Sequence, residues 1–153
     1  MIKGNEAVPK MIFVNLPVAD VEASAAFYAA IGFTQDLRFS QPGRAAAMTW
    51  SDTISIMLLS KPFYAGFTTK TIADAHATSE VLLCLSRDSR AEVDEITEAA
   101  AAAGGRADIR PVQDMGFMYG RAFEDLDGHI FEPMYMDVDA ALTAMSGQAE
   151  AAA

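Results

Sequence analysis

The sequence has only one cysteine, Cys84, and no long hydrophobic run. A single cysteine cannot form an internal disulfide, so no oxidising compartment is implied. An apolar run such as residues 81–85 is far shorter than the roughly 20 residues that a membrane-spanning helix needs. The first ten residues also lack the apolar core of a signal peptide. We therefore expect a soluble, cytoplasmic protein without a membrane partner.

Cations are scarce as well. Eleven Lys and Arg residues stand against 21 Asp and Glu residues, which gives a formal net charge of −10 and a pI near 4.4. Such a chain repels the phosphates of nucleic acids, so nucleic acid is excluded as an expected partner. By contrast, hydrophobic residues make up 52% of the 153 residues, which suffices for the core of one domain.

The first half of the chain predicts a strand, a helix and three further strands. The helix is expected at residues 21–31, with Asp20 as its N-cap and Gly32 as its C-terminal stop. The strands are expected at residues 13–18, 33–39, 44–50 and 54–60, separated by turn-forming residues.

The second half repeats this order. A strand is expected at residues 80–86, a helix follows the capping box that begins at Ser89, and strands follow at residues 107–111, 119–125 and 130–136. The repetition indicates an internal duplication. The expected fold class is therefore α+β, with two βαβββ modules.

The segments between and around the modules are less regular. We expect an N-terminal arm at residues 1–10, one domain at residues 11–137 and an alanine-rich tail at residues 138–153. Within the domain, residues 61–79 connect module 11–60 to module 80–137 and form either a lid or a linker. In the tail, residues 140–145 predict a helical turn or two, and residues 148–153 are expected to fray.

Two motifs carry a resemblance to a known family. The first is Leu16-Pro17-Val18-Ala19-Asp20, followed by Phe27-Tyr28 and Ile31-Gly32-Phe33; the second runs from Phe123 to Glu132 and reads FEDLDGHIFE. The chain thereby resembles the vicinal oxygen chelate superfamily of glyoxalases, bleomycin-resistance proteins and extradiol dioxygenases. The resemblance implies modules whose strands line a cleft for a small molecule, and a homodimer. In metal-dependent members, the first and last strands of each module supply up to four metal ligands.

Comparing the two modules within this chain suggests which residues occupy those four positions. Aligning residues 13–18 with residues 80–85 pairs Phe13 with Glu80, and aligning the last strands pairs Met57 with Glu132. Glu80 and Glu132 are thus the candidate catalytic residues and metal ligands. A phenyl ring has no donor and a thioether suits soft metals, so the set is incomplete. We expect either no cofactor or a weakly bound divalent metal.

Further residues are candidates for holding a substrate. Tyr119 and Arg121 share one face of an expected strand, and Arg121 could hold a carboxylate or phosphate. An equally weighted alternative is a surface salt bridge from Arg121 to Glu124 or Asp125. Phe13, Met57 and Trp50 would provide apolar lining. The remaining polar candidates, His129, His76 and Cys84, are expected to have structural or surface roles.

Two classes of function remain open at this point. Glu80 and Glu132 favour an enzyme of the lactoylglutathione lyase or dioxygenase kind, whereas Phe13 and Met57 favour a non-catalytic binding module of the bleomycin-resistance kind. We favour a family member with an incomplete metal site that acts on, or binds, an unknown small molecule.

Overall fold

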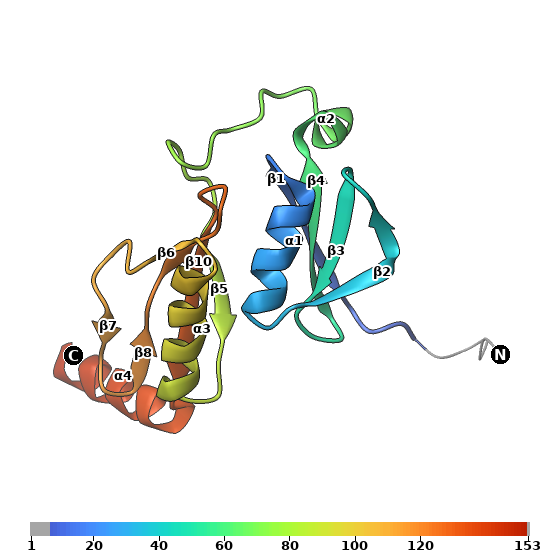
Figure 1. Cartoon of the computed structure of the whole chain (residues 1–153). Helices are drawn as coiled ribbons and strands as arrows, with labels where there is room; N and C mark the ends of the chain where they lie inside the picture. The colour runs from blue at the N-terminus through green and yellow to red at the C-terminus, as the bar shows by residue number, and fades with distance from the viewer. Residues whose placement is uncertain (1–6, 153) are drawn as a thin grey trace. The chain divides into compact units, whose positions relative to one another are not determined.

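The computed structural model describes residues 7–152, and their side chains up to residue 147. The described chain divides between Ile72 and Ala73 into two units, each built on its own sheet (Figure 1). This boundary lies inside the expected connector, residues 61–79. Most of the expected N-terminal arm, residues 1–6, lies outside the described residues.

The first unit has the expected βαβββ order. Its elements are β1 (Ile12–Val18), α1 (Val21–Ala30), β2 (Thr34–Gln41), β3 (Ala45–Thr49) and β4 (Ile54–Ser60). The strand order in the sheet is β1-β4-β3-β2, in which β1 and β4 are parallel and the other neighbours are antiparallel. A parallel pair needs a long crossover between its strands, which α1 and the two middle strands supply.

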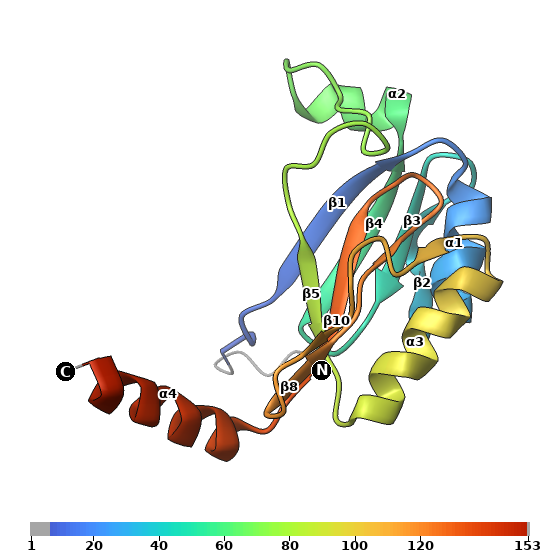
Figure 2. The ribbon, with the colours of Figure 1, turned by 90° about the vertical axis from the view of Figure 1, so that its left-hand side faces the viewer.

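Helix α1 covers one face of this sheet (Figure 2). It begins where expected, because the Asp20 carboxylate accepts a hydrogen bond from the backbone N–H of Ala23 at 3.0 Å. It ends at Ala30, and the chain turns away at Gly32, whose φ of +109° suits glycine. Phe27 and Tyr28 are buried between the helix and the sheet. The opposite face of the sheet carries the alternate side chains of each strand.

The connector after β4 contains short helices. Helix α2 spans Lys61–Tyr64 and is followed by the 3-10 turn Ala65–Phe67. The Ser60 hydroxyl caps α2 by accepting from the N–H of Phe63. Residues 68–82 then contain no helix or strand.

The second unit contains the remaining elements. They are β5 (Leu83–Ser86), α3 (Arg90–Ala102), β6 (Arg106–Ala107), β7 (Gln113–Asp114), β8 (Met118–Gly120), β9 (Phe123–Glu124), β10 (Ile130–Met136) and α4 (Val138–Ala152). Strand β10 is central: it pairs with β5 in parallel and with β8 and β9 in antiparallel fashion. Phe123 and Phe131 stack at 5.5 Å in the core beneath α3.

The expected strand at residues 119–125 is interrupted in the structure. Arg121 lies opposite Pro133 and donates its backbone N–H to the Pro133 carbonyl at 3.2 Å. Because proline has no N–H, the return bond of the ladder cannot form, and the strand splits into β8 and β9. A proline in the partner strand thus decides a boundary that the segment's own sequence does not show.

Three other boundaries differ from expectation. Strand β5 begins at Leu83 rather than residue 80, and the strand expected at residues 107–111 ends at Ala107 because Asp108 turns the chain with a φ of +55°. The expected turn or two in the tail is a helix that reaches Ala152. Across residues 7–152, we find no helix with the length and apolar character required to cross a membrane.

The Asp127-Gly128 turn packs closely against the end of the connector, and the close approach is at Gly128. Gly128 has a φ of +91°, and a Cβ there would lie 2.7 Å from backbone atoms of Ala75 and His76. We expect Gly128→Ala to destabilise the second unit by more than about 2 kcal/mol, because a clash adds to the strain of a positive φ. Urea unfolding measures this change.

Gly116→Ala is the matched control. Gly116 also has a positive φ, +79°, but its Cβ would meet nothing within 4 Å. We expect a loss of about 1 kcal/mol there, from backbone strain alone. Equal losses in the two variants would show that the connector does not pack on this turn.

Candidate functional site

The open face of the first sheet forms a hollow of about 520 Å³. Phe13 of β1 and Met57 of β4 both line it. They stand on the first and last strands of this module, which the family resemblance places at one site. They meet because β1 and β4 run parallel in a register that sets Phe13 opposite Ser55 and Asn15 opposite Met57. The other lining residues are Met11, Asp36, Arg38, Phe39, Ala47, Thr49, Ser51, Asp52 and Ser55.

A second hollow of about 430 Å³ continues along the same face. It shares Arg38, Phe39 and Met57 with the first and extends to the connector residues Phe63 and Phe67. The rings of Phe63 and Phe67 lie 5.1 Å apart, and the Arg44 guanidinium stands 4.2 Å from the centre of the Phe63 ring. The first part of the connector therefore contributes an aromatic wall to this face.

The charged groups of the hollow are mostly engaged with each other. Arg38 donates to both carboxylate oxygens of Asp36, at 3.0 and 2.8 Å, and its guanidinium also lies 5.5 Å from the centre of the Phe39 ring. The Arg38 guanidinium holds the pKa of Asp36 below its usual range. Asp36 therefore stays ionised at neutral pH and is a poor proton donor.

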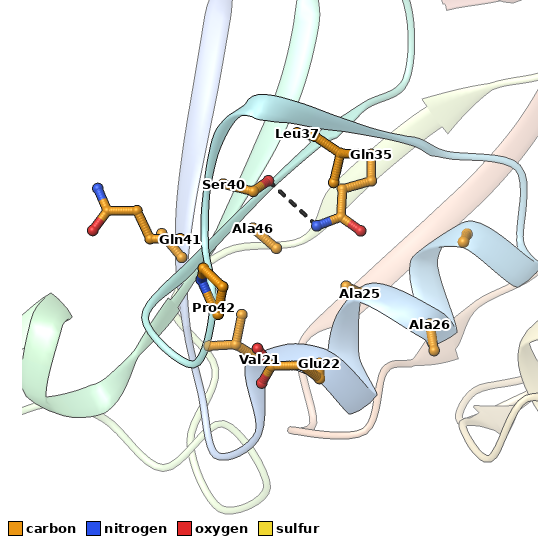
Figure 3. A pocket seen from close by; sticks show the side chains of 12 residues that line it. Val21, Glu22, Ala25, Ala26, Gln35, Leu37, Ser40, Gln41, Pro42 and Ala46 are labelled. Atoms are coloured by element: carbon orange, nitrogen blue, oxygen red, sulfur yellow. Dashed lines mark hydrogen bonds between the residues drawn. The ribbon is translucent and has the colours of Figure 1, made fainter.

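A third hollow, of about 570 Å³, lies on the helix-covered side of the first unit. Figure 3 shows the short side chains Ala25 and Ala26 of α1 facing Gln35 and Leu37 of β2. Alanines on the helix are too small to fill the space under the bent strand. The bend is held by Ser40, whose hydroxyl accepts from the Gln35 side chain and donates to the Asp36 carbonyl.

Trp50 does not belong to the open face. It comes two residues after Met48 and therefore points to the same side of the sheet, where Met48 is buried beneath α1. The centre of its ring lies 4.9 Å from that of Phe33. Trp50 also approaches Gly32 at the end of α1. Trp50 does not line the 520 Å³ hollow with Phe13 and Met57, because strand alternation turns it to the opposite side of the sheet. A role of Trp50 in substrate binding stays an untested prediction.

In the second unit, Glu132 faces away from α3, on the open side of its sheet. The register of β5 and β10 places Cys84 directly beside it, since Glu132 pairs with Cys84. The Glu132 carboxylate accepts a hydrogen bond from the Arg110 guanidinium at 2.5 Å. Burial, followed by the negative charge of Glu132, raises the pKa of the Cys84 thiol, while Arg110 lowers it. Cys84 is therefore mostly a thiol at neutral pH.

Sequence reasoning missed Arg110. It lies 22 residues before Glu132, in a segment expected to be a strand, and no spacing rule joins the two. The only available signal was its charge: the second unit has five arginines and no lysine against 16 Asp and Glu residues. Such scarcity makes each arginine a candidate ion-pair partner but does not indicate with which carboxylate.

The pairing of Phe13 with Glu80 is wrong by two residues. Asp20 and Ser89 are the N-caps of α1 and α3. When the two modules are aligned on these caps, Phe13 pairs with Leu82. The strand registers agree with this alignment. Asn15 lies opposite Met57 in the first unit, and the equivalent residues Cys84 and Glu132 lie opposite each other in the second. Glu80 lies before β5 and is exposed. The alignment therefore no longer supports Glu80 as the partner of Glu132, and a site role for Glu80 stays an untested prediction.

Arg121 and Tyr119 are engaged by α3 and the segment after β6. The Arg121 guanidinium donates to Asp94 at 3.1 Å, to Glu98 at 2.7 Å and to Asp108 at 2.7 Å, while the Tyr119 hydroxyl donates to Asp94 at 2.6 Å. Arg121 is only 8% exposed. Its acceptors are Asp94, Glu98 and Asp108 rather than the expected alternatives Glu124 and Asp125, and a role of Arg121 and Tyr119 in substrate binding stays an untested prediction. Strand alternation turns both side chains toward α3, opposite Glu132.

His129 directly follows a turn and His76 lies in the connector, as expected. The backbone N–H of His129 donates to the Asp125 carboxylate just after the Asp127-Gly128 turn, and that of His76 donates to the Asp74 carboxylate.

Comparisons with known proteins agree with this architecture. A family model described as "Bleomycin resistance protein-like N-terminal" matches residues 10–45. The structure of hypothetical protein SA1046 from S. aureus shares 26% identity with this chain, covers 85% of it and 95% of SA1046, and gives a TM-score of 0.69. The chain has the fold of the vicinal oxygen chelate superfamily. The resemblance and the α+β fold class expected from the sequence are confirmed.

Other structures with this fold have different functional names. A glyoxalase/bleomycin resistance protein/dioxygenase family enzyme from Burkholderia phytofirmans PsJN is 21% identical, with 83% of this chain and 98% of that chain covered and a TM-score of 0.67. A lactoylglutathione lyase from Agrobacterium tumefaciens is 18% identical, with 85% and 96% covered and a TM-score of 0.59. No curated protein sequence matches this chain. At these identities, the likeness establishes the fold alone.

The residues at the superfamily's metal positions do not fit a metal in this chain. With the corrected alignment, the four positions hold Phe13, Met57, Leu82 and Glu132. Phenyl and aliphatic groups have no donor, and Glu132 is already bound to Arg110. Within the described residues, no three His, Cys, Asp or Glu side chains are grouped so that they could hold a metal ion.

Arg121 should be a major stabilising residue of the second unit. We expect Arg121→Gln to lower the free energy of unfolding by about 2 to 3 kcal/mol, because it leaves three carboxylates close together around a buried position. Arg106→Gln should cost less than about 0.5 kcal/mol, since Arg106 is 76% exposed and lies 3.5 Å from Glu124. Urea unfolding at pH 7 compares the two variants; equal losses would contradict the structural role of Arg121.

The ion pair between Arg121 and Asp108 should also make the free energy of unfolding depend on pH. The Arg121 guanidinium holds the pKa of Asp108 below its usual value, so this contribution is fully present above about pH 4. It is lost as the pH falls through the lowered pKa of Asp108. The stability difference between the wild type and Arg121→Gln should therefore be constant from pH 5 to 7 and shrink below pH 4, as urea unfolding at pH 3, 4, 5 and 7 can show.

Proposed function

We propose that this protein binds a small molecule with an aromatic or aliphatic part on the open face of the first sheet, and that binding needs no metal. The observation that carries this proposal is the hollow of about 520 Å³ in which Phe13 and Met57 stand at positions where metal-dependent relatives would need ligands. Its volume lies within the range usual for small-molecule sites.

The two adjoining hollows of the open face carry exposed aromatic side chains. Phe13 is 55% exposed, Phe39 is 65% exposed and Phe67 is 68% exposed. Exposed aromatic side chains gathered on one concave face are a mark of a binding surface, because covering them removes apolar area from water. Met57 at the centre can adapt its shape to different ligands.

The ionisable groups of this face favour binding over chemistry. Among the residues that the structure describes, the ionisable ones lining the 520 Å³ hollow are Asp36, Arg38 and Asp52, and the first two neutralise each other. A general base or nucleophile would have to be free to move a proton or electron pair. We therefore favour a binding module, active as a homodimer, over a metal-dependent lyase or dioxygenase.

A neutral aromatic dye tests this proposal. N-phenyl-1-naphthylamine should bind the purified protein, and Phe13→Ser should weaken its binding about five- to tenfold, as expected when one aromatic contact of about 1 to 1.4 kcal/mol is lost. Fluorescence titration measures the dissociation constant. Chelation of metals with EDTA should leave it unchanged.

Leu37→Ser is the matched control. Leu37 is also an exposed apolar residue of this unit, at 76% exposure, but it lines the hollow on the helix-covered side. This variant should bind the dye as the wild type does. If the control weakens binding as much as Phe13→Ser, or if EDTA abolishes binding, the proposal is overturned.

The residues at the four metal positions lead to a separate prediction about the metal content of the protein. The protein, purified without chelators, should hold less than about half an equivalent of Zn, Ni, Fe or Mn per chain, because three of the four metal positions have no hard donor. Elemental analysis of the purified chain provides the measurement. A stoichiometric metal that is lost in Glu132→Gln would show that Arg110 gives way to a metal ion.

A further inference from the structure

The aromatic wall on the open face of the first unit comes from the connector. Helix α2 contacts β1 and β4 (Figure 1). Phe63 of this helix and Phe67 of the following 3-10 turn both line the hollow of about 430 Å³. The two residues come after β4 and before β5, outside the strand-helix-strand order that the units share. The wall is therefore a feature of this chain's connector and not of the repeated fold.

The wall is held in place by contacts within the first unit. The Ser60 hydroxyl accepts from the N–H of Phe63 at 3.3 Å, and the Arg44 guanidinium stands over the Phe63 ring at 4.2 Å from its centre. The ring of Phe67 in turn meets that of Phe63 edge to face at 5.1 Å. Phe67 nevertheless remains 68% exposed. A ring that is already positioned but uncovered loses little conformational freedom when a ligand packs on it.

The two hollows of this face follow each other along β4. Ser55 and Met57 line the hollow of about 520 Å³, whereas Met57 and Leu59 line that of about 430 Å³. On β1, Phe13 lines the first hollow and Asn15 the second. Four steps along a strand separate Ser55 from Leu59, which corresponds to about 13 Å. The two hollows together are therefore longer than one aromatic ring system and meet at Met57.

The second hollow favours an uncharged, flat group. Among the described residues, its one ionisable lining residue is Arg38, whose guanidinium donates to both carboxylate oxygens of Asp36. Phe39, Phe63 and Phe67 provide three aromatic rings around it. Aromatic rings pack on one another in stacked or edge-to-face pairs, which a second ring in this hollow can form.

We propose that the ligand of the first unit is an elongated molecule with two flat apolar parts, one in each hollow, and that Phe67 selects for the second part. This inference rests on the proposed function, which requires only the hollow around Phe13. It adds the class of ligand and a residue of the connector that determines specificity.

Two dyes of different length test the proposal. N-phenyl-1-naphthylamine has two flat parts, whereas 1-naphthylamine has one. Phe67→Ser should weaken binding of N-phenyl-1-naphthylamine about fivefold, because one aromatic contact is lost, and Phe13→Ser should weaken it as well. The shorter dye fills only one hollow, so it should lose affinity in just one of the two variants. Titration calorimetry measures all of these dissociation constants.

Two further variants are controls. Phe67→Tyr keeps the ring and should bind N-phenyl-1-naphthylamine within about twofold of the wild type. Leu37→Ser removes an exposed apolar side chain that lines neither hollow and should change the affinity for neither dye.

The outcomes separate this inference from the proposed function. If Phe13→Ser weakens binding of N-phenyl-1-naphthylamine but Phe67→Ser does not, the inference is overturned and the proposed function stands. If both variants weaken binding of 1-naphthylamine equally, the two hollows act as a single pocket, which also overturns the two-part ligand. A protein that binds neither dye would contradict the proposed function itself.

Discussion

The parallel pairing of the first and last strands in each unit is the constraint on which both candidate surfaces depend. In the first unit it places Asn15 beside Met57 and Phe13 beside Ser55. In the second it places Cys84 beside Glu132. Since the helix of each unit packs on one face of its sheet, the alternation of side chains leaves these residues on the other face. A shift of one residue in either ladder would exchange the core and the open surface.

The same ladders show that the two units have kept one architecture but different chemistry. The open face of the first unit is aromatic and rich in methionine, and its charged pair, Asp36 and Arg38, lies at the exposed side chain of Phe39. The open face of the second unit carries an ion pair beside a thiol. An apolar surface suits ligands that exclude water, whereas the charges of an ion pair are already satisfied in part by each other.

Two arginines of the second unit illustrate how position decides role. Arg121 is turned toward α3, where three carboxylates hold it, and its pKa is raised chiefly by the hydrogen bond to Asp108. Arg110 is bound to one carboxylate on the side away from that helix. A buried guanidinium with a full set of acceptors stabilises the fold, whereas one with shielded donors that lack acceptors lowers the free energy of unfolding.

The sequence by itself determined the fold. The caps Asp20 and Ser89, the stop at Gly32, the Asp127-Gly128 turn and the repeated order of elements are local signals, and local geometry follows from them. The family motifs also lie within single segments. Phe13 and Met57 could be placed together because the family resemblance sets the first and last strands of a module at one site.

Tertiary structure alone decided the partners of the charged residues and the facing of Trp50, Tyr119 and Arg121. Pairs such as Arg110 and Glu132 join segments 22 residues apart, and no periodicity relates them. The break opposite Pro133 and the two-residue shift that replaces Glu80 by Leu82 likewise depend on which residues lie across a ladder. Contacts across strands and between helix and sheet are set by packing of the whole unit, so a sequence read one segment at a time does not contain them.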